Sequence, residues 1–165
     1  MQENFNPPSK IKLIIGLGNP GKEFENTYHN AGALFVNYLK KFKSSVIGHK
    51  LLVSDSYMNL SGRFVKRVLK KYKTKPGELL LIHDDSDIPL SKYKFSFGRG
   101  SAGHKGVESA INALGTENFW RLRIGIRPKA GPPRRVKAGD LVLKKISPKD
   151  LKTLGGLFGE IALNF

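Results

Sequence analysis

The feature that most constrains the fold is a short apolar run, Glu78–His83, which reads Glu-Leu-Leu-Leu-Ile-His. Such an unbroken run is typical of a strand buried on both faces, because a strand with one solvated face alternates apolar and polar residues. A second run, Ile11–Leu17, precedes apolar residues at helical spacing from Ala31, which predict a helix ending near Lys43. Strands and helices therefore alternate, and we predict an α/β fold.

The rest of the chain continues this alternation. We predict strands at His49–Ser54, Lys92–Phe97 and Trp120–Ile126, and helices between Gly62 and Pro76-Gly77, over Val107–Leu114 and after the N-cap Ser147. The Pro-rich and base-rich segment Arg127–Gly139 is predicted to be a mobile loop. A length of 165 residues predicts one domain over residues 1–165, with residues 1–9 as a flexible extension.

The turn after the first strand contains a dinucleotide-like G-x-G-x-x-G pattern, Gly16-Leu-Gly-Asn-Pro-Gly21. In a dinucleotide site the helix would open within this turn, yet Asn19-Pro20-Gly21 is typical of a turn that continues as a loop. The acidic residue that would hold the ribose is also missing, since the sequence there reads Lys40-Lys-Phe-Lys43. We therefore predict a tight strand exit that presents Asn19, and no nicotinamide cofactor.

The charge of the chain predicts a polyanionic partner. There are 29 Lys and Arg residues against 13 Asp and Glu residues, a formal net charge of +16. Nucleic acid is the leading candidate and an anionic membrane surface is the alternative. No apolar stretch approaches a membrane span and the first residues lack the apolar region of a signal peptide, so we expect a cytoplasmic protein without membrane binding. The absence of cysteine excludes a thiolate nucleophile and Cys-based zinc sites.

Acidic residues follow the strand Glu78–His83 directly. Because sites in α/β sheets assemble at the carboxyl ends of strands, we expect Asn19 and Asp84 to share one crevice. A magnesium site formed by Asp84, Asp85 and Asp87 is an alternative interpretation, but no phosphate-binding loop lies nearby in the sequence. We expect structural roles for His49 and His83.

Five segments in order resemble bacterial-type peptidyl-tRNA hydrolases over nearly the whole chain. They are Gly16–Gly32, Tyr57-Met-Asn-Leu-Ser-Gly62, His83-Asp-Asp-Ser-Asp-Ile-Pro89, Gly103-His-Lys-Gly106 and Phe119–Ile126. The resemblance implies a single α/β domain with a mixed twisted sheet flanked by helices. It also implies a monomer that cleaves the ester between peptide and tRNA without a metal or an organic cofactor.

The resemblance assigns His29 as the general base that activates water, with Asp84 orienting its ring. A single positioned base suffices for this chemistry, since proton transfer contributes about 10²- to 10⁴-fold to such reactions. The same resemblance places Asn19 and Asn59 at the peptide amide and carbonyl groups, which would select for a blocked amino group.

Phe24 and Tyr57 occupy positions that contact the 3′ end of tRNA in the family. Phe24 and Tyr57 would stack on bases of the 3′ end, while Lys94 and Arg123 would bind phosphates of the acceptor end. The basic residues between Arg63 and Lys75 would add phosphate contacts. Each of these groups also has an ordinary structural interpretation, as a turn residue, a helix cap, a core aromatic or a solvated helix face.

The chain departs from the family in three places. Lys105 follows the loop histidine where the family has Asn, so a substrate-binding amide is replaced by a cation that donates but cannot accept. His29 and Asn59 are only 30 positions apart and the C-terminal region is short, so we expect a trimmed sheet and a more open peptide crevice. A non-catalytic RNA-binding relative of the same fold is the alternative function that Lys105 suggests.

Overall fold

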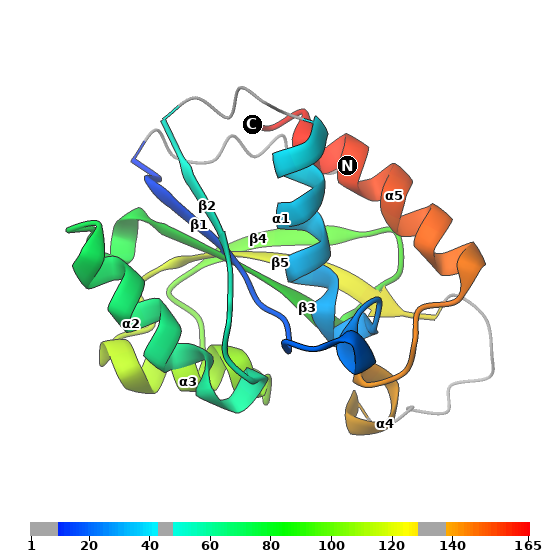
Figure 1. Cartoon of the computed structure of the whole chain (residues 1–165), viewed down its shortest axis with the longest axis horizontal. Coiled ribbons are helices and arrows are strands. Elements are labelled where there is room, and N and C mark those ends of the chain that lie inside the picture. Colours follow the sequence, from blue (N-terminus) through cyan, green and yellow to red (C-terminus); the bar gives the residue numbers. More distant parts are fainter. Residues whose placement is uncertain (1–9, 43–47, 129–137) are drawn as a thin grey trace.

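A five-stranded sheet with strand order β2-β1-β3-β5-β4 forms the centre of the molecule (Figure 1). This computed structural model describes residues 10–42, 48–128 and 138–165. The strands are β1 (Leu13–Gly16), β2 (Lys50–Val53), β3 (Leu79–Pro89), β4 (Tyr93–Phe97) and β5 (Trp120–Arg127). The first three pairings are parallel, and β4 pairs antiparallel with β5. The predicted mixed sheet is confirmed.

Helices cover both faces of this sheet (Figure 1). The helices α1 (Ala31–Phe42) and α5 (Pro148–Ala162) pack on one face, where the rings of Phe35 and Phe158 lie 5.2 Å apart. The helices α2 (Ser61–Lys71) and α3 (Lys105–Leu114) pack on the other face, over Leu13, Ile15 and Leu81. The short helix α4 (Ala138–Val142) precedes α5. No helix in the described ranges is long and apolar enough to cross a bilayer.

Several predicted boundaries are confirmed. Helix α1 begins at Ala31, and Ser147 caps α5 by accepting a hydrogen bond from the backbone N–H of Asp150 (3.1 Å). The predicted flexible extension at residues 1–9 lies outside the described residues, as do residues 129–137 of the predicted mobile loop.

Three boundaries differ from the prediction. Helix α2 ends at Lys71 rather than at Pro76, because Lys73 adopts a left-handed conformation (φ 50°) and the N–H of Thr74 returns to the carbonyl of Leu69 (2.9 Å). Helix α3 begins at Lys105, two residues before Val107. Strand β3 continues past His83 to Pro89 because it keeps pairing with β5 after its pairing with β1 has ended at Ile82.

Candidate active site

The segment that carries His29 lies against the carboxyl end of β1. Gly16 in β1 lies directly against Gly32 in α1. A methyl group at position 16 would overlap the carbonyl oxygen of Gly32, and a methyl group at position 32 would overlap the carbonyl oxygen of Ile82. The glycines therefore let the start of α1 press onto β1 and β3, two residues before Asp84. Their role in this structure is close packing of α1 against the sheet.

A second set of contacts holds the His29 segment from the C-terminal side of the chain. The backbone N–H groups of Tyr28 and Ile146 donate to Lys144 and Asn26 (3.1 and 2.7 Å), and the Tyr28 hydroxyl donates to Asp150 Oδ2 (2.5 Å). Burial, followed by this bond to Asp150, raises the pKa of Tyr28, which keeps the hydroxyl protonated as the donor. We call these contacts the C-terminal clamp. His29 directly follows a residue that the clamp fixes.

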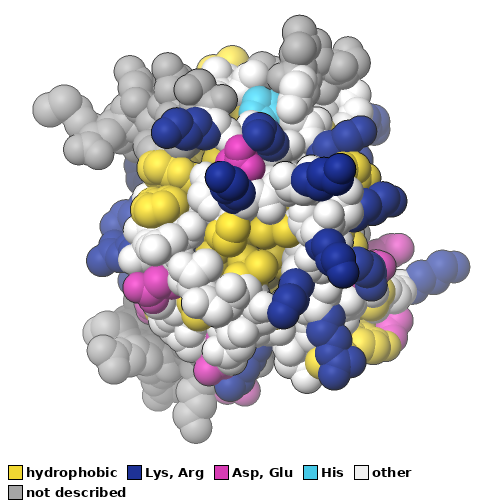
Figure 2. Space-filling model, turned by 90° about the vertical axis from the view of Figure 1, so that its left-hand side faces the viewer, with side chains coloured by type: hydrophobic (Ala, Val, Ile, Leu, Met, Phe, Trp, Pro, Cys, Tyr) yellow, Lys and Arg dark blue, Asp and Glu magenta, His cyan; other side chains and the backbone are white. Residues whose placement is uncertain are grey.

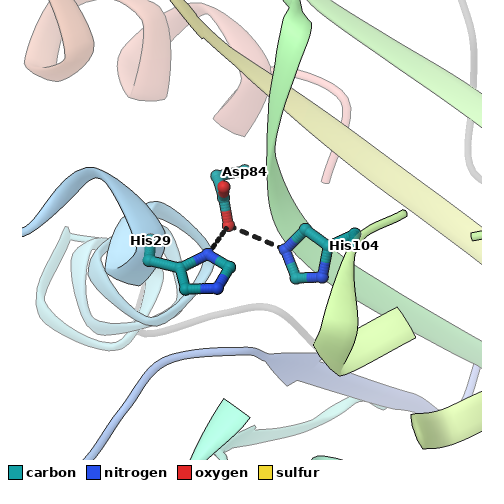
Figure 3. Close-up of side chains that lie close together, drawn as sticks. All are labelled: His29, Asp84 and His104. Atoms are coloured by element: carbon teal, nitrogen blue, oxygen red, sulfur yellow. Dashed lines mark hydrogen bonds and ion pairs between the residues drawn. The ribbon is translucent and has the colours of Figure 1, made fainter. Parts of the chain in front are cut away.

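Asp84 accepts hydrogen bonds from two histidines at one carboxylate oxygen (Figure 3). The Nδ1 atom of His29 and the Nε2 atom of His104 each lie 2.8 Å from Oδ1, and the Asp84 side chain is 2% exposed. Burial alone raises the pKa of the Asp84 carboxyl, but the N–H groups of His104 and His29 outweigh burial and hold that pKa well below its usual range. Asp84 is therefore a buried, ionised carboxylate.

The hydrogen-bond network assigns the tautomers of both histidines. His104 is the N-cap of α3, where its Nδ1 accepts from the backbone N–H groups of Gly106 and Val107 (3.1 and 3.3 Å). Its proton is therefore on Nε2, which donates to Asp84. His29 donates to Asp84 through Nδ1–H, so the Nε2 atom of the neutral ring carries a lone pair. A positioned neutral imidazole of this kind is able to act as a general base.

Two metal interpretations fail on this geometry. The ligand atoms of His29, Asp84 and His104 lie within 4.8 Å of one another, as a metal site would require. However, His104 has no lone pair at Nε2 while its Nδ1 accepts two backbone N–H groups. The magnesium alternative fails because neighbouring carboxylates on β3 diverge: Asp84 meets the histidines, whereas Asp85 accepts from Arg123 Nε (2.8 Å).

A cavity of about 660 Å³ opens beside this group, lined by His29, Asp84, His104, Lys105 and Arg123 among others. The glycine-rich loop that covers it is held by Arg121, whose Nη2 donates to the carbonyls of Arg99 and Gly100 (2.9 and 3.0 Å). His29 therefore lies at the wall of a cavity with cationic groups. Asn19 is not among the residues that line this cavity.

The predicted peptide-binding residues and the two predicted stacking rings lie around the turn that follows β1 and the segment before α2. The backbone N–H of Asn19 donates to Asn30 Oδ1 (2.8 Å), and Asn19 Oδ1 accepts from the N–H of Met58 (2.7 Å), which ties this turn to the start of α2. The rings of Phe24 and Tyr57 lie edge to face with centroids 6.1 Å apart, and Tyr57 is 51% exposed. Asn59 is exposed next to them. The side-chain oxygen of Asn19 is thus used internally, which leaves its amide N–H groups for a ligand.

The predicted phosphate-binding residues lie opposite each other across β4 and β5. Lys94 pairs in register with Arg123, and Lys94 is exposed. Arg123 is mostly buried and is held by Asp85, so part of its guanidinium is already occupied. Lys105 is exposed at the start of α3, with Nζ 3.6 Å from Glu108 Oε2. Lys94 and Lys105 are the more accessible cations.

The sequence analysis did not assign a role to His104. The predicted helix began at Val107, whereas α3 begins at Lys105, so the position of His104 as the N-cap was missed. What the sequence could not supply was the second partner, since Asp84 is 20 residues away and meets His104 only through the fold. His83 matches its expected structural role: burial lowers its pKa well below the usual range, and its Nδ1–H donates to the backbone oxygen of Asp84 (2.7 Å).

Comparison with known proteins agrees with this fold. Residues 13–164 match the family described as Peptidyl-tRNA hydrolase. The chain is 38% identical over 162 residues to the peptidyl-tRNA hydrolase of Aquifex aeolicus, covering 87% of this chain and 82% of that protein. It is 40% identical over 161 residues to that of Mycoplasma mycoides, covering 87% and 85%. The crystal structure of peptidyl-tRNA hydrolase from Acinetobacter baumannii superposes with a TM-score of 0.83 at 31% identity, covering 94% of this chain and 86% of that one. The chain therefore belongs to the peptidyl-tRNA hydrolase family.

Proposed function

We propose that the protein hydrolyses the ester between peptide and tRNA, with His29 as the general base. The observation that carries this proposal is the position of the His29 ring, whose Nδ1 lies 2.8 Å from a buried carboxylate at the wall of a cavity. The Nε2 lone pair takes a proton from water while the water oxygen attacks the ester carbonyl. When the tetrahedral intermediate collapses, the imidazolium returns that proton to the departing ribose hydroxyl.

Asp84 supports both states of the base. In the resting enzyme its carboxylate fixes the Nδ1–H tautomer, and in the transition state its negative charge stabilises the imidazolium that forms. Because the second donor, His104, also binds Oδ1, the carboxylate cannot rotate away from His29 without losing two hydrogen bonds. Asp84 and His104 are thus positioning residues for the base.

The residues around the turn after β1 and the segment before α2 fit the peptide and the 3′ end of tRNA. The amide groups of Asn19 and Asn59 are able to bind a peptide carbonyl, whereas the free ammonium of an aminoacyl ester would find another donor at Asn19. The half-buried Phe24 ring and the exposed Tyr57 ring offer stacking surfaces for a base, worth about 1–3 kcal/mol each. Lys94 and Lys105 would bind acceptor-end phosphates, together with the guanidinium N–H groups of Arg123 that do not contact Asp85.

A hydrolysis assay with N-acetyl-aminoacyl-tRNA tests the proposal. We expect the wild-type protein to release the N-acetyl-amino acid, and His29→Ala to lose nearly all turnover while still binding tRNA. The matched control is His49→Ala, a histidine on the N-terminal side of β2 that does not line the cavity. Full activity in His29→Ala would remove His29 from the mechanism.

The same assay addresses the second candidate function, an RNA-binding relative without turnover. The observation behind it is Lys105, which stands where the family has a substrate-binding amide. Binding of tRNA by the wild-type protein without any release of the N-acetyl-amino acid would establish this alternative.

We also infer that the protein acts as a monomer in the cytoplasm, where its substrate arises. The support for this is the family resemblance together with the high net charge, which opposes self-association. Light scattering that gave twice the 18.3 kDa chain mass would contradict the monomer.

A further inference from the structure

Helix α2 divides into a buried apolar face and an exposed face that is entirely basic. Phe64, Val65, Val68 and Leu69 are buried against the sheet and α3. The exposed positions are Arg63, Lys66, Arg67, Lys70 and Lys71, and the helix contains no acidic residue. Lys and Arg side chains crowd the face of the molecule that carries α2 (Figure 2).

Four of these cations form a line that we call the α2 stripe: Arg63, Lys66, Lys70 and Lys73. Within α2, Arg63, Lys66 and Lys70 recur every three or four residues, so neighbours lie about 5–6 Å apart on one side of the helix. These three span about 10 Å along the axis, and Lys73 follows just beyond the end of the helix. Within the described part of the chain, the ion pairs leave all four cations without a carboxylate, whereas the adjacent Arg67 pairs with Asp55 (2.6 Å).

Two details of the stripe are not explained by helix stability. Cations stabilise the last turn of a helix, but Arg63 lies in the first turn of α2, where the helix dipole disfavours positive charge. Lys73 follows the C-cap Tyr72 with φ 50°, a left-handed position that glycine adopts without steric cost. The chain thus keeps a cation at each end of the stripe where another residue would favour the fold.

The stripe starts beside the candidate peptide and 3′-end site. Helix α2 begins directly after the turn that holds Tyr57 and Asn59, and Asn19 Oδ1 fixes that turn at Met58 (2.7 Å). From there the helix leads away from the site along the outside of the molecule (Figure 1). The stripe is therefore placed to contact a part of the substrate beyond the ester.

We propose that the α2 stripe binds the phosphate backbone of tRNA outside its 3′-terminal nucleotides, so that the enzyme recognises tRNA by length as well as by its ester. This rests on the proposed function. A row of cations without carboxylate partners fits a regular polyanion, whereas an acidic peptide carries charges at variable positions. Phosphate contacts of this kind release counterions and therefore weaken as salt rises.

Two substrates with the same ester test the proposal. One is N-acetyl-aminoacyl-tRNA, and the other is the same N-acetyl-aminoacyl group on the 3′-terminal trinucleotide alone. The test variant is Lys66→Gln/Lys70→Gln/Lys73→Gln, and the matched control is Lys40→Gln/Lys41→Gln/Lys152→Gln, which removes three exposed cations from α1 and α5. The measured quantity is the ratio of kcat/KM for the long substrate to kcat/KM for the short one.

We expect this ratio to fall about tenfold or more in the α2 variant at 0.1 M salt, and the slope of log(kcat/KM) against log[salt] to become shallower by about two. The control variant should keep the wild-type ratio. Equal ratios in the two variants would overturn the proposal. A loss confined to short substrates that carry acidic dipeptides would also overturn it, because the stripe would then bind peptide.

A single substitution separates binding from folding. Lys73→Gly should raise the unfolding midpoint and weaken tRNA binding. If Lys73 contacts only solvent, the substitution will raise the unfolding midpoint and leave tRNA binding unchanged. Binding of uncharged tRNA, measured directly with all these variants, tests the stripe even if no hydrolysis is seen. Failure of both substrates with the wild-type protein would instead contradict the proposed function.

Discussion

His104 connects the candidate active site to the start of helix α3, and its two contacts can be separated by mutation. The ring caps α3 through Nδ1 and donates to Asp84 through Nε2. Loss of a helix cap costs about 1 kcal/mol, and loss of a hydrogen bond to a charged group costs about 1.5–3 kcal/mol. His104→Ala should therefore lower the free energy of unfolding by about 2.5–4 kcal/mol.

His104→Asn isolates the contact with Asp84. Asparagine is a good N-cap residue, but its shorter side chain cannot also reach the carboxylate. We expect this variant to lose only about 1.5–3 kcal/mol, and both variants to share the same fall in kcat, because Asp84 then holds His29 with one donor fewer. Urea unfolding followed by Trp120 fluorescence measures the first quantity, and hydrolysis of N-acetyl-aminoacyl-tRNA the second.

The pH dependence follows from the lowered pKa of Asp84. A carboxyl whose pKa is depressed in the folded state stabilises the fold above its unfolded pKa of about 3.9, and this stability is lost as the pH falls toward the folded value. In His104→Asn the pKa of Asp84 is depressed less than in the wild type. The loss in its free energy of unfolding should therefore be largest near neutral pH and should shrink below about pH 4. Equal losses in the Ala and Asn variants, or no coupling with Asp84→Asn in a double-mutant cycle, would refute the two-contact account.

Three further predictions concern other parts of the site. Gly32→Ala should lower the free energy of unfolding by on the order of 3 kcal/mol, because the methyl group would overlap the Ile82 carbonyl. Gly155→Ala in α5, where the methyl group would meet open space, should instead be stabilising. Urea titration measures both changes. Lys105→Asn should raise kcat/KM for N-acetyl-aminoacyl-tRNA, because it restores an amide that both donates and accepts beside His104, and an unchanged rate would show that the cation is no handicap. Tyr28→Phe removes the hydrogen bond to Asp150 and should lower the free energy of unfolding by about 1 kcal/mol. It should also lower kcat more than it changes KM. A change in KM alone would show that the C-terminal clamp does not position His29.

The sequence predicted the parts of the fold that depend on local signals. The start of α1 at Ala31 and the cap at Ser147 follow from apolar spacing and capping chemistry within a few residues. The end of α2 was misplaced because its stop signal is normally a glycine, and here Lys73 adopts the left-handed conformation instead. The extension of β3 to Pro89 depends on its neighbour β5, about 40 residues away, and no local pattern reports that pairing.

The same distinction holds for the candidate site. His29 and Asp84 were identified by family resemblance, and the structure brings them within hydrogen-bond distance. The second bond to Asp84 from His104 and the capture of Arg123 by Asp85 are contacts between distant segments, so residue types and spacing could not reveal them. The roles of Asn19, Phe24, Tyr57, Asn59, Lys94 and Lys105 toward substrate stay predictions.

The C-terminal clamp has a consequence for the protein during its own synthesis. Tyr28, beside the base, receives its partners from Lys144 and Asp150, which follow it in the sequence by 116 and 122 residues. A partly synthesised chain therefore carries His29 and Asp84 without the contacts that fix the base segment. Every such nascent chain is itself a peptide esterified to tRNA. By this order of assembly, the site is completed only after the segment through Asp150 has been translated and has folded against Tyr28.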